Sequence, residues 1–140
     1  MEWDDSIEDP KQERQRLEQL VKEKPNGADA YYDLAVVCEN LNDDDKAIEY
    51  CEKAISLYPY KPLYYAFLVF LTVRFDTKKA LDALVEFIEL VPDESDYYTE
   101  RVIDELAYAD CKIAVEYIEN LRAQDKEHIA RKIQGWIWNP

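Results

Sequence analysis

The side chains able to act as nucleophiles or metal ligands are few and widely spaced in this sequence. The single histidine, His128, stands among charged residues near the C-terminus. The three cysteines, Cys38, Cys51 and Cys111, have no spacing typical of a zinc site. No candidate nucleophile has a base positioned to activate it. The sequence therefore predicts a protein that is not an enzyme, with no catalytic residue, metal or cofactor.

An acidic cluster at residues 42–46 contains three consecutive aspartates. A calcium-binding loop instead spaces its oxygen ligands over twelve positions. An aspartate directly before a helix accepts a hydrogen bond from the first backbone amides. We therefore interpret Asp43 or Asp44 as the N-cap of a helix over about 44–57.

Composition excludes several classes of partner and location. The 140 residues carry a formal charge of −14, the same sign as nucleic acids and anionic membrane surfaces, so neither is expected to bind. The longest apolar run, residues 64–73, is about half as long as a membrane-spanning helix. The first ten residues lack the features of a signal peptide, and an odd number of cysteines suggests a reducing compartment. We therefore expect a cytoplasmic protein with no membrane contact.

Tyrosine doublets recur along the chain at one interval. They begin at Tyr31, Tyr64 and Tyr97, each 33 residues after the last. Prolines and alanines recur at steps of 33 or 34: Pro25, Pro59 and Pro92, then Ala47, Ala80 and Ala114. Intervals of this size are typical of stacked helical repeats, and a chain with only two glycines favours helices throughout.

The first full unit has large and small residues in a defined order. It reads Tyr31-x2-Leu34-Ala35-x2-Cys38, then Ala47-x3-Cys51-x2-Ala54, then Pro59. This pattern resembles the tetratricopeptide repeat, a helix–turn–helix unit of about 34 residues. The resemblance covers roughly residues 12–122. It implies an all-α fold of repeats stacked in a short right-handed superhelix, with capping helices at both ends and a concave groove lined by the first helix of each repeat.

The chain is expected to have three parts. Residues 1–9 form a flexible acidic tail, residues 10–124 the repeat domain, and residues 125–140 a C-terminal capping helix and tail. The repeat domain divides into a lone helix and three repeats: 10–24, then about 28–60, 61–93 and 94–124. In the third repeat, aligning Tyr97 with Tyr31 and Tyr64 would place charged residues at core positions. Moving the alignment by one residue puts Tyr98, Val102 and Leu106 at those positions and restores an apolar stripe.

The two tyrosines of a doublet are predicted to have different roles. Neighbouring residues on a helix point about 100° apart, so the first tyrosine faces the core and the second faces the groove. Together with valines four residues further on, the second tyrosines form a predicted partner-binding ladder: Tyr32, Val36, Tyr65, Val69, Tyr98 and Val102. The alternative is that these side chains fill the groove themselves, and it stays open above all for Tyr65, Val69 and Tyr98.

The last six residues, "GWIWNP", suggest a change of structure. Gly135 is expected to interrupt or end the last helix, leaving Trp136, Ile137 and Trp138 extended. In one interpretation, Trp136 seals the end of the stack and Trp138 folds over it. In the other, the tail enters a groove, either its own or that of a second copy.

The resemblance also bears on function. Family members that hold the C-terminal carboxylate of heat-shock chaperones use lysine, asparagine and arginine on their first helices. The matching positions here hold Tyr32, Val36 and Ala66, so this clamp is absent. We expect a protein-interaction module, an adaptor or scaffold, that binds a basic or apolar peptide or helix of a protein partner in its groove. Two alternatives stay open: a dedicated chaperone resembling those of type III secretion, and a structural subunit that assembles with its own copies as a homo-oligomer.

Overall fold

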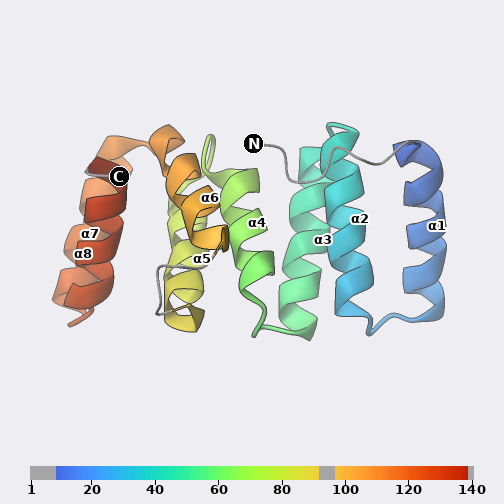
Figure 1. Ribbon diagram of the computed structural model, residues 1–140, viewed down its shortest axis with the longest axis horizontal. Coiled ribbons are helices and arrows are strands. Elements are labelled where there is room, and N and C mark those ends of the chain that lie inside the picture. The colour runs from blue at the N-terminus through green and yellow to red at the C-terminus, as the bar shows by residue number, and fades with distance from the viewer. Residues whose placement is uncertain (1–8, 92–96, 139–140) are drawn as a thin grey trace.

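The computed structural model describes residues 9–91 and 97–138, which form a row of helices (Figure 1). In chain order they are α1 Pro10–Glu23, α2 Ala28–Asn40, α3 Asp44–Leu57, α4 Pro62–Thr72, α5 Thr77–Leu90, α6 Tyr97–Glu105, the 3₁₀ helix η1 Leu106–Tyr108, α7 Cys111–Ala123 and α8 Glu127–Trp138. No strand occurs within those two ranges, and the predicted all-α repeat fold is confirmed. Residues 1–8 of the predicted acidic tail, and the repeated Pro92, lie outside the described residues.

Aspartates start four of the helices. Each accepts a hydrogen bond from the backbone amide three residues later, which satisfies a donor that the helix itself leaves free. The four N-caps are Asp9, Asp43, Asp76 and Asp110, again 33 or 34 residues apart. The sequence offered Asp43 and Asp44 as candidates for the N-cap of α3, and Asp43 is the N-cap.

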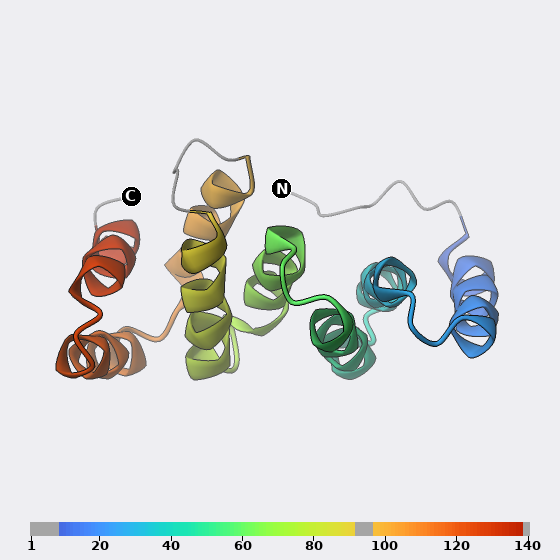
Figure 2. The same cartoon turned by 90° about the horizontal axis from the view of Figure 1, so that it is seen from below.

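The helices form two layers with the core between them (Figure 2). Helices α2, α4 and α6 lie on one side, and α3, α5 and α7 lie on the other. Helix α1 packs against α2, and α8 packs against α7. The side chains between the layers, such as Leu34, Cys51 and Leu84, have no exposed surface. Among residues 9–91 and 97–138, no helix has the length and apolar character to span a bilayer.

The hydrogen bond that closes the turn between the two helices spans one residue fewer in the second repeat than in the first. In the first, the Asp43 amide donates to the carbonyl of Cys38, five residues earlier, and Asn42 between them has φ of 61°. In the second, the Asp76 amide donates to Thr72, only four residues earlier. A residue of α2 is therefore equivalent to the residue 34 positions later in α4. A residue of α3 is equivalent to the residue 33 positions later in α5.

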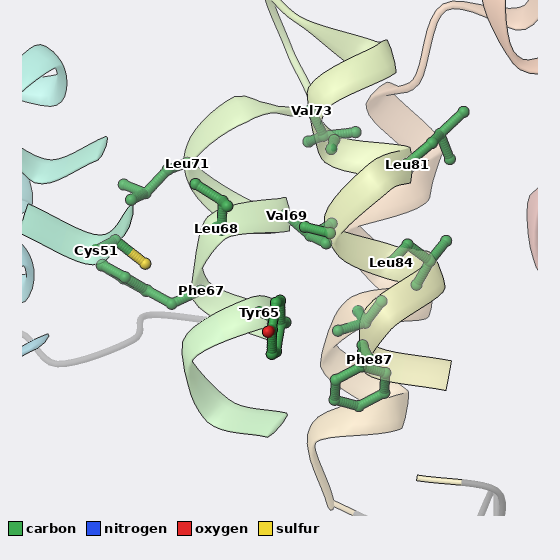
Figure 3. Packing of buried hydrophobic residues seen from close by; sticks show 14 of the residues in the cluster. Cys51, Tyr65, Phe67, Leu68, Val69, Leu71, Val73, Leu81, Leu84 and Phe87 are labelled. Carbon is green, nitrogen blue, oxygen red and sulfur yellow. The ribbon is translucent and has the colours of Figure 1, made fainter. Parts of the chain in front are cut away.

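This difference in the turn changes which tyrosines correspond. At a step of 34, Tyr65 rather than Tyr64 matches Tyr31. Tyr31 packs beside the ring of Tyr50 on its own second helix, and Figure 3 shows Tyr65 likewise between α4 and α5, near Phe87. The predicted division of roles within the doublet does not hold here, since Tyr64 and Tyr65 are both buried.

The helices of the third pair are more widely separated than those of the first two. Helix α6 packs against α4, whereas α7 packs against α5 and α8. Val102 and Leu106 are buried and Asp104 is exposed, which agrees with the alignment moved by one residue. A separate hydrogen bond, from the Asp110 amide to the Thr77 hydroxyl at 3.0 Å, holds the start of α7 to α5.

The C-terminal helix differs from its prediction at both ends. It begins at Glu127, because Asp125 has φ of 59° and belongs to the turn. Gly135 does not end it: the helix continues through Trp138. Trp136 is partly buried against the core and Trp138 is 42% exposed. Glycine lowers helix stability only by about 1 kcal/mol, which the packing of Trp136 offsets.

Candidate peptide-binding surface

The six residues of the predicted ladder differ in exposure. Four of them are buried: Val36, Tyr65, Val69 and Val102. Tyr32 and Tyr98 are partly buried and pack against the core. The rotation of α4 accounts for two of the buried positions, since it turns Tyr65 and Val69 toward α5 (Figure 3). In this structure the ladder therefore offers a ligand the surfaces of Tyr32 and Tyr98 and almost none of the other four.

Four aromatic side chains, which we call the aromatic cluster, join α2 to α4. Tyr32 stacks on Tyr64 with ring centroids 5.2 Å apart and meets Phe67 edge-on at 5.5 Å. Phe67 in turn stacks on Phe70 at 5.7 Å. Tyr64 and Phe67 are buried, whereas Tyr32 and Phe70 are partly exposed. The cluster thus consists of two buried rings that support two rings accessible to a ligand.

Sequence reasoning missed Phe67 and Phe70 as site residues. At the 33-residue step of the doublets, Val69 is the equivalent of Val36. At the 34-residue step that the structure establishes for these helices, the equivalent is Phe70, which is larger and partly exposed. The step of 34 between Pro25 and Pro59 is the signal that could have shown this.

Two carboxylates flank the cluster on α2. Asp29 accepts a hydrogen bond from the Tyr64 hydroxyl and one from Lys61 Nζ at 2.9 Å. These two donors lower the pKa of Asp29, so it is charged at neutral pH. Partial burial and the nearby charge of Asp29 raise the pKa of Asp33. Two carboxylates thus lie beside Tyr32, and Asp29 is paired with Lys61.

The bond between Tyr64 and Asp29 makes stability depend on pH. We expect Tyr64→Phe, which removes only the hydroxyl, to lower the free energy of unfolding by about 1 kcal/mol at neutral pH, because Asp29 is largely solvent-exposed. The folded-state pKa of Asp29 lies below its unfolded value, so this stabilisation is complete above the usual aspartate pKa of about 3.9 and is lost as the pH falls through the lowered folded value. Urea denaturation of both proteins at neutral and strongly acidic pH measures it.

The control for this prediction is Tyr58→Phe, because the Tyr58 side chain is exposed. It should leave the free energy of unfolding unchanged at both pH values. A difference between the wild type and Tyr64→Phe that stays the same from neutral to acidic pH would contradict the role of the Asp29 charge.

The cysteines and the histidine are not gathered at this surface. Burial raises the pKa of the Cys38 thiol to about 11, and burial also raises that of Cys51, whose Sγ donates to the carbonyl of Tyr64 at 3.3 Å. Both are therefore thiols at neutral pH and poor nucleophiles. Cys111 and His128 are exposed, and the described part of the chain contains no group of His, Cys, Asp and Glu arranged to hold a metal ion.

The comparison with known families concerns the part of the chain that carries Tyr32. The family model of the tetratricopeptide repeat matches residues 28–61, which comprise α2, α3 and the loop that follows. The chain therefore contains a tetratricopeptide repeat at residues 28–61. No curated protein matches the chain. Tetratricopeptide repeats generally mediate protein–protein interaction and are typically not enzymes.

The aromatic cluster extends beyond the residues that match the tetratricopeptide repeat. Tyr32 comes from the matched repeat, whereas the other three rings come from α4, just after it. The tetratricopeptide repeat and the next helix pair therefore build the surface together.

Proposed function

We propose that this protein is an adaptor or scaffold that binds a peptide or helix of a protein partner on the face formed by α2, α4 and α6. The observation that supports this most is the aromatic cluster, in which Tyr32 and Phe70 are held by buried rings beneath them. Rigid aromatic side chains with little conformational freedom to lose are common anchors in protein interfaces. Tyr98 extends the proposed contact to α6, along with those parts of the ladder that a partner can reach.

The charges favour a partner that is basic as well as apolar. Asp29 and Asp33 lie beside the cluster, and the whole chain carries −14. A basic segment would be attracted by this field, and its affinity would fall as salt rises. The proposal includes a cytoplasmic location, which suits a chain with two buried free thiols.

A random peptide library provides the test without a known partner. Peptides selected on the wild-type protein should bind Tyr32→Ala with an affinity about 5- to 150-fold lower, equivalent to about 1–3 kcal/mol. Isothermal titration calorimetry measures the affinities. Circular dichroism must show that the variant is folded, because Tyr32 also packs on Tyr64 and Phe67.

Two further variants make the result specific. Tyr98→Ala tests the contribution of α6, and Val115→Ala is the control, since Val115 is 44% exposed on α7, in the opposite layer of helices. Selected peptides that bind all three variants as well as the wild type would show that this face is not the binding surface.

A further inference from the structure

A pocket lies where α2 and α4 begin, separate from the exposed part of the aromatic cluster. It has a volume of about 610 Å³ and is formed by the first turn of α2 and the loop between α3 and α4. Its lining includes Gly27, Asp29, Tyr58, Tyr60 and Lys61. Such a volume is typical of pockets that accept small ligands or single side chains of a partner.

Two exposed aromatic rings form one side of this pocket. Tyr58 is 51% and Tyr60 69% exposed. Their ring centroids are 5.6 Å apart and their planes meet at 83°, so the rings form a corner with two nearly perpendicular walls. Ring faces attract cations, because the π-electrons make the face of the ring negative.

A carboxylate lies in the same pocket. The Asp29 side chain is 72% exposed, so it is accessible despite its bond to Lys61. Lys61 lies in the same pocket, with its Nζ 2.9 Å from Asp29 and 5.4 Å from the centroid of the Tyr64 ring, so a second cation would share Asp29 with it.

Cations over tyrosine rings recur in this protein. Lys53 lies over Tyr31 at 5.9 Å, and the Arg74 guanidinium lies over Tyr108 at 3.8 Å. Among the described residues, no cation lies over Tyr58 or Tyr60. The aromatic corner thus has the chemistry of a cation site, and no side chain of the described chain supplies its cation.

We infer that this pocket binds an arginine side chain carried by an extended segment of the protein partner. The guanidinium stacks on the corner of Tyr58 and Tyr60 and donates hydrogen bonds toward Asp29. Arginine fits better than lysine, because its planar group can stack on a ring and pair with a carboxylate at once. The formal charge of −14 attracts such a segment from a distance. This inference depends on the proposed function in one respect only, namely that the partner is a protein.

A short peptide tests the site without the partner. The probe is acetyl-Gly-Arg-Gly-amide, titrated into ¹⁵N-labelled protein while the backbone amide shifts of Gly27, Asp29 and Lys61 are followed by NMR. The control peptide carries citrulline, which has nearly the shape of arginine but no charge. We expect saturable shifts with the arginine peptide and at least about tenfold weaker binding of the citrulline peptide. Equal affinities, or shifts that map to other residues, would overturn the inference.

A pair of leucine variants isolates the aromatic corner. Tyr60→Leu keeps an apolar side chain at an exposed position and removes the ring, and we expect it to weaken binding of the arginine peptide at least about fivefold. Phe75→Leu, at an exposed ring far along the chain from the pocket, should bind like the wild type. If Tyr60→Leu also binds like the wild type, the corner is not the site. Failure here would leave the Tyr32-dependent binding of selected peptides unchanged, so the two proposals fail separately.

Discussion

Replacing Phe67 by alanine should lower the free energy of unfolding by about 3–5 kcal/mol. The Phe67 side chain has no exposed surface and lies between the rings of Tyr32 and Phe70, close to Cys51 of α3 (Figure 3). The alanine variant would lose this apolar burial and leave a cavity in the closely packed region between the first two repeats. Urea denaturation followed by circular dichroism measures the change.

The matched control is Phe70→Ala on the same helix. Phe70 is partly exposed and contacts the cluster through one ring, so we expect a cost of about 1–2 kcal/mol. If both variants lost the same free energy of unfolding, the distinction between buried and accessible rings in the aromatic cluster would be wrong.

Replacing Tyr64 by alanine should cost about 3–4 kcal/mol and also reduce cooperativity. Tyr64 is 1% exposed, stacks on Tyr32 and donates its hydroxyl to Asp29, so it belongs to α4 while most of its named contacts are to α2. Stacked repeats unfold together only while the interfaces between them are strong. We expect the variant to unfold over a broader denaturant range, with a lower m-value, than the wild type.

Tyr60→Ala serves as the comparison for Tyr64→Ala. Because Tyr60 is largely exposed, its removal should change the free energy of unfolding by less than about 0.5 kcal/mol. A transition for Tyr64→Ala as steep as that of the wild type, with an equally small loss, would show that this residue does not couple the two repeats.

Much of the fold was predictable because its signals are local in the sequence. The spacing of prolines and alanines indicated stacked helix pairs, and the acidic cluster indicated Asp43 or Asp44 as the N-cap of α3, of which Asp43 is the N-cap. The moved alignment placed Val102 and Leu106 in the core, where they lie. Each of these inferences needs only the period of a helix and the preference of aspartate for N-caps.

The roles of the tyrosines were not predictable from their spacing. The doublets recur at 33 residues, and this regular step concealed that α2 and α4 correspond at 34. A shift of the correspondence by one residue is equivalent to rotating the helix by about 100° relative to its neighbour. The steps of 33 and 34 were both visible in the sequence, but the sequence does not say which one applies to which layer of helices.

The candidate site was predictable only in part, for a related reason. The Tyr32 side chain is partly exposed, whereas Val69 and Val102 are buried. Exposure depends on how closely neighbouring helices approach, which a single repeat does not determine. Tyr58 and Tyr60 lie in a loop outside the helical pattern, so no periodicity could single them out.

The separation of α6 from α7 has a mechanical consequence. The helices of the stack transmit force one after another, so the most weakly packed contact accounts for most of the extension at a given force. In the first two units, the paired helices hold each other directly, so these units are stiff. In the third, α6 is held by α4, and α7 by α5 and α8. A load applied between the two ends would reach α7 through its contact with α5, so we expect the molecule to extend first at this junction, while the segment that carries the aromatic cluster keeps its shape.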